Sequence, residues 1–358
     1  MSRIKHITLL QFRNYSSAIF SFNSPVTCIT GANGSGKTNL LDAVYYLCYT
    51  KSYFSAYQQN SVQNGTDGFR VEGSFEKNGI EERISCKWKQ GKKEVLAQGI
   101  PYDKPADHIG KYSAVMIAPD DMELINGGSE LRRRWIDSIL SQVDRDYLDK
   151  LLHYQRIVLQ RNAWLKMQFF KPASDRVELE YYNSQLADCG TYIYECRNAF
   201  IKRFMPLLEN FYHQLSGGVE KMSVVYESDL LEKNLAVWLE ENFQQDMRQQ
   251  RTLRGIHRDD WSFFLNGVPL KSFASQGQKK SFLFALKLAQ YAYLNIESGH
   301  LPILLLDDVF EKLDQDRIVA LLRIIQGPDF GQVILTDTHA ERVNLAFGAE
   351  TDISFITL

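Results

Sequence analysis

The sequence predicts an α/β fold whose sheet is interrupted by a long, mainly helical insertion. Strand patterns dominate the first part of the 358-residue chain, and helical spacing of apolar residues dominates the middle. An alternation of helix and buried strand then returns near the end. We therefore expect one α/β lobe from residues 1–118 and 297–358, with residues 119–296 inserted as a helical lobe.

The first part of the chain contains several predicted strands. Residues 4–12 alternate apolar and polar side chains, as a half-buried strand does. The other strand candidates are 26–30, 69–75, 83–88 and 113–118. Gln90-Gly91-Lys92-Lys93 predicts a hairpin turn after 83–88. Apolar residues at helical spacing predict a helix over 39–47.

The middle of the chain has the spacing of amphipathic helices. Helices are expected over 131–140, 147–167, 178–215 and 229–248. We interpret their apolar stripes as ordinary core packing rather than as a face for a partner helix.

An αβ pattern returns near the end of the chain. A helix is expected over 281–296, and Leu301–Leu306 has the continuous apolar character of a central parallel strand. Residues 333–336 form a shorter strand candidate. We expect the strand over 26–30 and this block to share one sheet.

Composition excludes some classes of protein. Hydrophobic residues make up 44% and charged residues 23%, as in ordinary globular proteins, and no apolar run is long enough to span a bilayer. A net charge of -2 argues against coating nucleic acid by bulk charge, although it leaves a local basic face open. The five scattered cysteines lack metal-ligand spacing and suit a reducing, cytoplasmic location, and Met1 to Arg13 lacks the apolar core of a signal peptide.

A glycine-rich loop is the strongest functional signal. Gly31-Ala32-Asn33-Gly34-Ser35-Gly36-Lys37-Thr38 fits G-x-x-x-x-G-K-[ST] at every fixed position, between a predicted strand and a predicted helix that starts near Asn39. This order aims backbone N–H groups and the positive helix end at an anion. We expect ATP to bind here, with Lys37 reaching its β- and γ-phosphates and the Thr38 hydroxyl binding Mg²⁺. The alternative is a glycine turn without a ligand.

Two carboxylates follow the predicted strand 301–306. Asp307 is the candidate Mg²⁺ ligand, acting through water, because α/β sheets bind ligands at the carboxyl ends of their strands. Asp308 is the candidate to orient or deprotonate the water that attacks the γ-phosphate. The alternative is an exposed acidic loop.

Ser275-Gln276-Gly277-Gln278 stands just before the predicted helix 281–296. Alone it would be interpreted as a helix cap. The order of phosphate loop, S-x-G-Q and acidic strand end resembles that of ATP-binding-cassette ATPases. This resemblance implies that Ser275, with Gly277 and Gln278, contacts the γ-phosphate held by a second copy of the chain. Ser275 would then act in catalysis with Lys37 and Asp308.

The same resemblance implies roles for two later segments. Glu311-Lys312-Leu313-Asp314 lies where the D-loop of these ATPases lies. His339 is a candidate γ-phosphate sensor, although a surface histidine after a strand is a comparable alternative.

Many short blocks, in order and over nearly the whole chain, resemble the RecF family of bacterial recombination-mediator ATPases. These blocks are Phe12-Arg13-Asn14-Tyr15, residues 31–43, Lys51-Ser52-Tyr53-Phe54, residues 118–125, residues 132–137, Leu140-Ser141-Gln142, residues 154–162, Gly255-Ile256-His257-Arg258-Asp259-Asp260, Ser275-Gln276-Gly277-Gln278 and residues 306–310. Ile256 replaces the usual Pro, and Lys279-Lys280 replaces a more Gln/Arg-like pair.

The family resemblance implies an SMC-like head without the long coiled coil. It implies an ATP-dependent homodimer that binds double-stranded DNA near single-strand gaps, with partners of the RecO and RecR type and a role in loading RecA. Arg13 and Asn14 are expected near the nucleotide, while His257, Arg258 and Asp259 are expected to have a structural or interdomain role. Most relatives of this layout carry Glu where Asp308 stands, so slow turnover is expected.

The DNA-contacting residues are the less defined part of this prediction. Arg132, Arg133 and Arg134 form the densest basic run, at the start of a predicted helix where the helix dipole disfavours positive charge. Lys87, Lys92 and Lys93 form a second candidate patch. For each patch, the alternative is a solvated face with acidic neighbours.

Three other functions were weighed against this one. A transporter's nucleotide-binding subunit does not explain why Ser275 follows Thr38 by as many as 237 positions. A small-molecule kinase has no use for Ser275-Gln276-Gly277-Gln278. A nucleotide-switched scaffold with little hydrolysis and little DNA binding remains compatible with the sequence.

Overall fold

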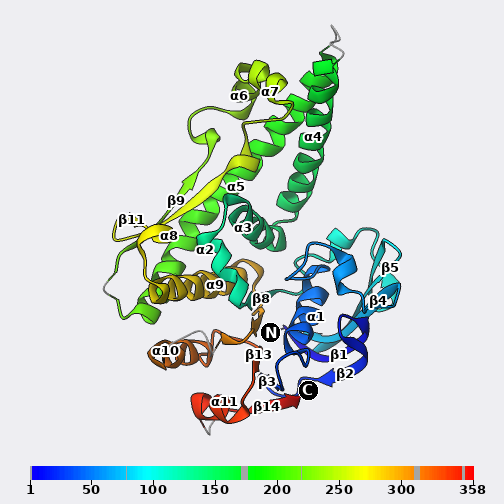
Figure 1. The fold of residues 1–358 in the computed structure, drawn as a ribbon, viewed down its shortest axis with the longest axis vertical. Helices are drawn as coiled ribbons and strands as arrows, with labels where there is room; N and C mark the ends of the chain where they lie inside the picture. The colour runs from blue at the N-terminus through cyan, green and yellow to red at the C-terminus, as the bar shows by residue number, and fades with distance from the viewer. Residues whose placement is uncertain (1, 78, 171–175, 219, 310–314, 349–350) are drawn as a thin grey trace. The chain divides into compact units, whose positions relative to one another are not determined.

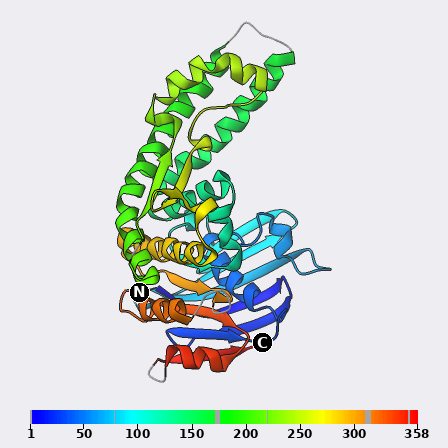
Figure 2. The ribbon, with the colours of Figure 1, turned by 60° about the vertical axis from the view of Figure 1, so that its left-hand side comes forward.

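A computed structural model describes residues 2–77, 79–170, 176–218, 220–309, 315–348 and 351–358 (Figures 1 and 2). The chain separates into two compact units. The first unit contains Met1–Met122, Asn210–Val219 and Gln276–Leu358, and the second contains Glu123–Glu209 and Glu220–Ser275.

A parallel sheet forms one layer of the first unit. Its strand order is β14-β3-β13-β12-β8, and every neighbouring pair is parallel. The strands are β3 (Val26–Thr30), β8 (Ala114–Ile117), β12 (Ile303–Leu306), β13 (Val333–Asp337) and β14 (Ile353–Thr357). The first four are buried along their whole length, as expected for strands covered on both faces. The prediction that the early strand and the C-terminal block share a sheet is confirmed.

An antiparallel sheet of order β2-β1-β4-β5-β6-β7 forms the second layer of this unit. Its strands are β1 (Ser2–Phe12), β2 (Tyr15–Ser21), β4 (Gly68–Lys77), β5 (Ile80–Lys89), β6 (Lys92–Ala97) and β7 (Ile100–Pro101). The predicted hairpin turn lies between β5 and β6, which pair from Lys89 and Lys92 onward.

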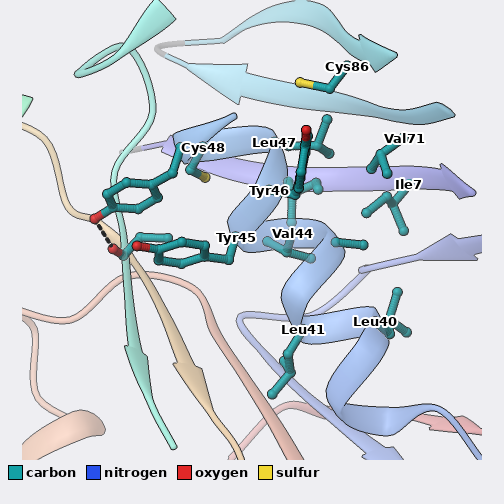
Figure 3. Packing of buried hydrophobic residues seen from close by; sticks show 14 of the residues in the cluster. Ile7, Leu40, Leu41, Val44, Tyr45, Tyr46, Leu47, Cys48, Val71 and Cys86 are labelled. Carbon is teal, nitrogen blue, oxygen red and sulfur yellow. Dashed lines mark hydrogen bonds between the residues drawn. The ribbon is translucent and has the colours of Figure 1, made fainter. Parts of the chain in front are cut away.

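Helix α1 (Lys37–Tyr49) lies between the two sheets and contacts strands of both. It is apolar on nearly every side, and its residues from Leu40 to Tyr49 are all buried. Figure 3 shows Tyr46 and Leu47 directed toward the antiparallel sheet, while Tyr45 and Cys48 point to the opposite side. A helix enclosed in this way has little freedom to shift, so it fixes the position of the loop at its N-terminus.

The remaining elements of the first unit connect or flank these sheets. They are the 3₁₀ turns η1 (Gln58–Ser61), η2 (Pro105–His108) and η3 (Pro119–Met122) and the helices α9 (Gln276–Ser298), α10 (Gln315–Ile325) and α11 (Ala340–Phe347). Helix α9 packs against β8 and η3, so it clusters with the first unit. The compact units therefore differ from the predicted lobes, in which residues 119–296 included this helix.

The second unit is mainly helical. Its helices are α2 (Glu123–Asn126), α3 (Ser129–Val143), α4 (Arg145–Phe170), α5 (Val177–Ser216), α6 (Leu235–Glu241), α7 (Phe243–Gln249) and α8 (Leu270–Phe273). The predicted helices over 131–140, 147–167 and 178–215 correspond to α3, α4 and α5. Both ribbon views show α4 beside α5 (Figures 1 and 2). The last turns of α5, from Asn210, cluster with the first unit.

The single helix predicted over 229–248 is wrong. The chain instead forms a 3₁₀ turn, η4 (Asp229–Leu231), followed by the separate helices α6 and α7. Asn234 begins α6, because its side chain accepts a hydrogen bond from the Val237 N–H. Local capping thus divides a stretch whose apolar spacing alone suggests one helix.

The second unit also contains a sheet that the sequence analysis missed. It has the order β11-β10-β9, from β9 (Met222–Glu227), β10 (Asp260–Leu265) and β11 (Val268–Pro269), and the turn η5 (Ile256–Arg258) precedes β10. Across the parts of the chain described here, none of the helices has the length and apolar character needed to cross a membrane.

Candidate nucleotide-binding site

The glycine loop connects β3 to α1, as its sequence predicts. Gly31, Gly34 and Gly36 have φ angles of +151°, +83° and +114°, which residues with a Cβ adopt only under strain. A Cβ on Gly36 would also come within 2.5 Å of the Asn14 Nδ2 atom. The glycines are therefore needed for the loop's backbone shape.

The interior of this loop fits an anion. The Lys37 ammonium donates to the Gly31 and Ala32 carbonyls at 2.8 and 3.1 Å, and the residue is only 5% exposed. The buried Ser35 hydroxyl has no hydrogen-bond partner among the described residues. A buried cation beside an unsatisfied hydroxyl and the start of α1 is what a phosphate group requires.

The turn between β1 and β2 supports the loop from outside. The Asn14 amide donates to the Ser35 carbonyl at 3.1 Å and accepts from the Asn39 amide at 2.7 Å, and the Tyr15 hydroxyl donates to the Gly36 carbonyl at 3.1 Å. Asn14 and Asn39 thus both lie at the glycine loop.

Arg13 is linked to helix α1 through Asp42. Its guanidinium donates to Asp42 of α1 at 2.6 Å and to the Ser52 hydroxyl at 2.9 Å. Asp42 is fully buried and also accepts from the Tyr53 N–H at 2.7 Å. Burial raises the pKa of Asp42, and the neighbouring Arg13 opposes that rise.

Thr38, Asp307 and Thr336 meet where α1, β12 and β13 come together. The Thr38 hydroxyl donates to both Asp307 carboxylate oxygens, at 2.9 and 3.0 Å, and the Thr336 hydroxyl donates to Asp307 Oδ1 at 2.9 Å. Burial raises the pKa of Asp307, and the nearby Asp308 carboxylate adds to the rise. The hydroxyl and carboxylate oxygens present here are of the kind that Mg²⁺ prefers.

Asp308 follows with a left-handed backbone, at φ +47°. Its N–H donates to the Thr336 hydroxyl at 2.9 Å, and the residue is partly exposed. The Thr336 hydroxyl is thus hydrogen-bonded to both Asp307 and Asp308. The strained backbone at Asp308 turns the chain away from the direction of β12.

His339 lies at the mouth of a cavity of about 730 Å³, lined in part by Thr338, Arg342 and Gln315. The residue is exposed, and its backbone N–H donates to the Asp337 carboxylate at 2.7 Å. Asp337 is itself buried and paired with Arg342 at 2.7 Å. The segment after β13 is therefore braced, while the imidazole remains accessible.

The predicted signature lies at the start of α9. Gln276, Gly277 and Gln278 form its first turn, and Ser275 immediately precedes it. A Cβ on Gly277 would lie 3.1 Å from the Arg317 guanidinium, which donates to the Ser281 hydroxyl at 2.6 Å. Arg317 thus packs on this turn, and Gly277 leaves the space for it. The predicted D-loop, residues 311–314, and Phe310 lie outside the described residues.

The basic run on α3 proves to be divided between interior and surface. Arg132 is 8% exposed and pairs with Asp260 at 2.7 Å, and it also donates to the Leu124 and Gly127 carbonyls. Arg133 donates to the Asp259 carbonyl at 2.6 Å. Arg134 is exposed and pairs with Glu130 on its own helix. The burial of Arg132 removes it from the predicted DNA-binding patch.

The second basic patch is divided in the same way. The Lys93 ammonium donates to the Thr50 carbonyl at the C-terminal end of α1, at 2.7 Å, and burial lowers its pKa. Lys93 is therefore a structural residue that satisfies a helix end. Lys92 is exposed, whereas Lys87, which pairs with Glu94 at 3.1 Å, is partly exposed.

Asp259 is buried in the second unit, whereas His257 is partly buried and Arg258 is exposed. His257 contacts the Tyr154 hydroxyl at 2.9 Å, and Asp259 pairs with the buried Arg197 at 2.6 Å. Within the described residues, no group of three or more His, Cys, Asp or Glu side chains has the arrangement of a metal site.

Sequence reasoning missed Thr336 as a site residue and Asp42 as a support. Thr336 ends a predicted parallel strand, as Asp307 follows one, and this shared position was the available signal. Asp42 follows Lys37 by five residues on an apolar helix, where a buried carboxylate requires partners.

Comparison with known proteins identifies the family of this chain. Residues 3–351 match the sequence model of the RecF/RecN/SMC N terminal domain. The DNA replication and repair protein RecF of Flavobacterium johnsoniae is 43% identical over 340 residues, covering 95% of each chain. That of Cytophaga hutchinsonii is 38% identical over 348 residues, covering 97% of this chain and 92% of the relative.

Solved structures give the same result for the fold. The recombination mediator protein RecF-ATPrS in the RecFOR pathway superposes with a TM-score of 0.88 at 27% identity, covering 99% of this chain and 96% of that chain. An Smc head domain from Pyrococcus furiosus, at 16% identity and a TM-score of 0.57 over 99% of this chain and 93% of that one, shares the fold. The glycine loop, the acidic end of β12 and the full-length similarity agree: the chain belongs to the RecF family of DNA replication and repair proteins, with an ABC-type, SMC-like head fold.

Proposed function

We propose that this protein is an ATP-dependent DNA-binding protein of recombinational repair that hydrolyses ATP slowly in the bacterial cytoplasm. The observation that carries the proposal is the joining of the glycine loop to Asp307 through the Thr38 hydroxyl, in a chain 43% identical to a RecF protein. A phosphate loop and an acidic strand end in contact are the two parts that phosphoryl transfer requires.

ATP would be held by the loop residues 31–39, with Lys37 on the β- and γ-phosphates and Asn14 buttressing the loop. Thr38 and Asp307 would hold Mg²⁺, Asp307 through water. The ion, when bound, neutralises charge that develops on the β- and γ-phosphate oxygens. Arg13 would support the nucleotide site indirectly, because its guanidinium fixes the Asp42 carboxylate on α1.

Asp308 is the proposed residue that orients or deprotonates the attacking water. Its N–H bond to Thr336 sets its position. An aspartate side chain is one methylene shorter than glutamate, so its carboxylate reaches less far toward the water, and slow turnover follows.

Two copies of the chain would close around two ATP molecules. Ser275, with Gly277 and Gln278, would contact the γ-phosphate held by the other copy, and His339 would serve as a γ-phosphate sensor. Converting a mostly open population into a mostly closed one requires about 5.5 kcal/mol of differential binding. Hydrogen bonds to charged groups contribute about 1.5–3 kcal/mol each, so a few such bonds on two γ-phosphates are enough. ADP lacks these groups and would release the partner.

DNA would bind the closed dimer at duplex regions near single-strand gaps. Among the candidate basic residues, Arg134 and Lys92 are exposed, and Lys87 and Arg133 are partly exposed. RecF relatives are DNA replication and repair proteins, and a structural neighbour belongs to the RecFOR pathway. We therefore propose mediator partners of the RecO and RecR type and a role in loading RecA.

DNA binding measured with ATP, ADP and a non-hydrolysable analogue tests the proposal. Lys37→Ala should lose nucleotide-dependent DNA binding, and Asp308→Asn should give persistent complexes because ATP stays intact. Ser275→Arg should abolish ATP-dependent dimerisation in sedimentation or light scattering while leaving ATP binding to each copy.

One result would favour a second candidate, a nucleotide-switched scaffold. If the wild-type protein dimerises with ATP but shows neither salt-sensitive DNA binding nor DNA-stimulated hydrolysis, the DNA-binding function is overturned. The short Asp308 side chain is the feature that favours low turnover in such a scaffold.

A further inference from the structure

A cluster of Tyr53, Asp121 and Lys287 lies in the first unit, apart from the residues proposed to touch ATP. Asp121 is buried, and Tyr53 is partly buried. Lys287 belongs to α9 and is 1% exposed. Its ammonium pairs with Asp121 at 2.9 Å and donates to the Tyr53 hydroxyl at 2.7 Å, and the same hydroxyl contacts Asp121. The ammonium also lies 5.2 Å from the centre of the Tyr53 ring.

Each member of the cluster belongs to a different part of the nucleotide-binding unit. Tyr53 follows α1, and its N–H donates to Asp42 on that helix at 2.7 Å. Asp42 in turn pairs with Arg13 at 2.6 Å, beside the turn that supports the glycine loop. A continuous set of polar contacts therefore runs from the loop's support to Lys287 on α9.

Asp121 connects the cluster to the acidic end of β12. It lies in η3 and accepts from the Ala118 N–H at 2.8 Å, just after β8. The preceding carbonyl, that of Ile117, accepts from the Asp307 N–H at 2.8 Å. The cluster thus joins α9 both to the glycine-loop helix and to the strand end that carries the proposed Mg²⁺ ligand.

Packing alone would not require these polar groups. Replacing a buried ion pair with apolar residues of similar volume is often neutral or stabilising, so such a pair is weak evidence of stability. The cluster instead sets the orientation of α9. An ammonium with two oxygen partners fixes one rotation of the helix about its axis and one position along that axis. The turn Gln276–Gln278 lies about 15 Å along the same continuous helix, which transmits that position.

We infer that Tyr53, Asp121 and Lys287 are positioning residues that hold the first turn of α9 in register with the glycine loop of the same chain. This inference rests on the proposed function, in which that turn receives the ATP of a second copy. The cluster makes one copy's own nucleotide site and its surface for the partner's nucleotide move as a single rigid part.

The test uses the double variant Lys287→Met/Asp121→Asn, which leaves no unpaired buried charge. A matched control is Arg161→Met/Asp246→Asn, which removes an equally buried ion pair, 2.7 Å long, from the second unit. Tyr53→Phe, which deletes a single hydroxyl, should change each readout in the same direction as the double variant and by less.

Two readouts separate positioning from stability. Amide hydrogen exchange over Gln276–Phe284 should be at least tenfold faster in the cluster variant than in wild type, with exchange in α1 unchanged. ATP binding to single copies should stay within about threefold, while the ATP concentration needed for dimerisation should rise at least tenfold. The control should change neither readout, even if it lowers the melting temperature.

Either of two results overturns the inference: unchanged exchange at the start of α9, or loss of ATP binding to single copies equal to the loss of dimerisation. If the wild-type protein never dimerises with ATP, the proposed function fails instead, and the exchange measurement alone decides the role of the cluster.

Discussion

The Thr38 hydroxyl donates to both carboxylate oxygens of Asp307, at 2.9 and 3.0 Å, and so joins the first turn of α1 to the end of β12. These residues are far apart in the sequence, and they meet because β13 pairs with both β3 and β12. The contact places a hydroxyl and a carboxylate side by side next to the glycine loop.

Thr38→Val should weaken Mg²⁺-dependent ATP binding while leaving the fold intact, since valine fills the same volume without a hydroxyl. We expect at least a tenfold loss of affinity in Mg²⁺, or about 1.4 kcal/mol, measured with a fluorescent ATP analogue. In excess chelator, the variant and wild type should bind alike. Thr38→Ser, which keeps the hydroxyl, should resemble wild type, and a Val variant with full Mg²⁺ dependence would contradict the assignment.

Gly36→Ala should weaken nucleotide binding through the backbone. Alanine at φ +114° is strained, and its methyl group would displace Asn14 from the loop. Strain of about 1–3 kcal/mol corresponds to roughly a fivefold to hundredfold loss of ATP affinity. Gly65→Ala is the control, because Gly65 also has a positive φ, +83°, but nothing lies within 4 Å of the added Cβ. Equal losses in both variants would rule out a loop-specific effect.

Arg132 and Arg134 should respond differently to substitution. Arg132→Met should lower thermal stability, because it leaves Asp260 and two carbonyls without their donor. Its effect on DNA binding per folded molecule should be small. Arg134→Ala should leave the melting temperature nearly unchanged, since its pair with Glu130 is exposed.

The DNA measurement decides the role of Arg134. If it contacts a phosphate, its replacement by alanine should weaken binding to all duplex sequences and reduce the salt slope by about 1. Lys202→Ala, an exposed basic residue of α5, serves as the control for overall charge. An unchanged slope for Arg134→Ala would move the DNA contact away from α3.

Protonation of His108 should destabilise the protein in mild acid. His108 is fully buried and contacts the Leu47 carbonyl near the end of α1 at 2.7 Å, and burial lowers its pKa from 6.5 to about 4. The unfolded chain therefore takes up this proton first as pH falls. Neutral His108 makes its full contribution to the free energy of unfolding above pH 6.5. This contribution declines by up to about 3 kcal/mol as the pH falls toward 4.

Denaturant unfolding between pH 7.5 and pH 4.5 measures this decline. His108→Gln keeps an N–H donor for Leu47 but does not titrate, so its stability should fall less over the same range. Parallel curves for the variant and wild type would show that other groups account for the acid sensitivity.

Local features of the site could be predicted from the sequence, because the pattern and the geometry belong to the same residues. The loop 31–38 is of this kind: its glycines, its lysine and the following helix are consecutive. The sheet was also predictable, since Leu301–Leu306 has the apolar character of a central strand.

Other features depend on how distant segments pair. Thr336 reaches Asp307 only because of the register between β12 and β13, which no single segment encodes. Arg132 and Arg134 are equivalent in a charge count, yet they lie on different faces of α3 and one of them is buried. The sequence analysis missed strands β9, β10 and β11 of the second unit. Two of them, β9 and β10, lie on either side of the segment 229–248 that was predicted as one helix.

The order of strands in the parallel sheet has a consequence for synthesis on the ribosome. Strand β3, which leads into the glycine loop, pairs with β13 and β14, and both come from residues 333–357. During translation this strand has no partner in its own sheet until residues 333–357 have been made, although the antiparallel layer can already form. A nascent chain should therefore acquire its ability to hold ATP abruptly, when β13 and β14 join the sheet.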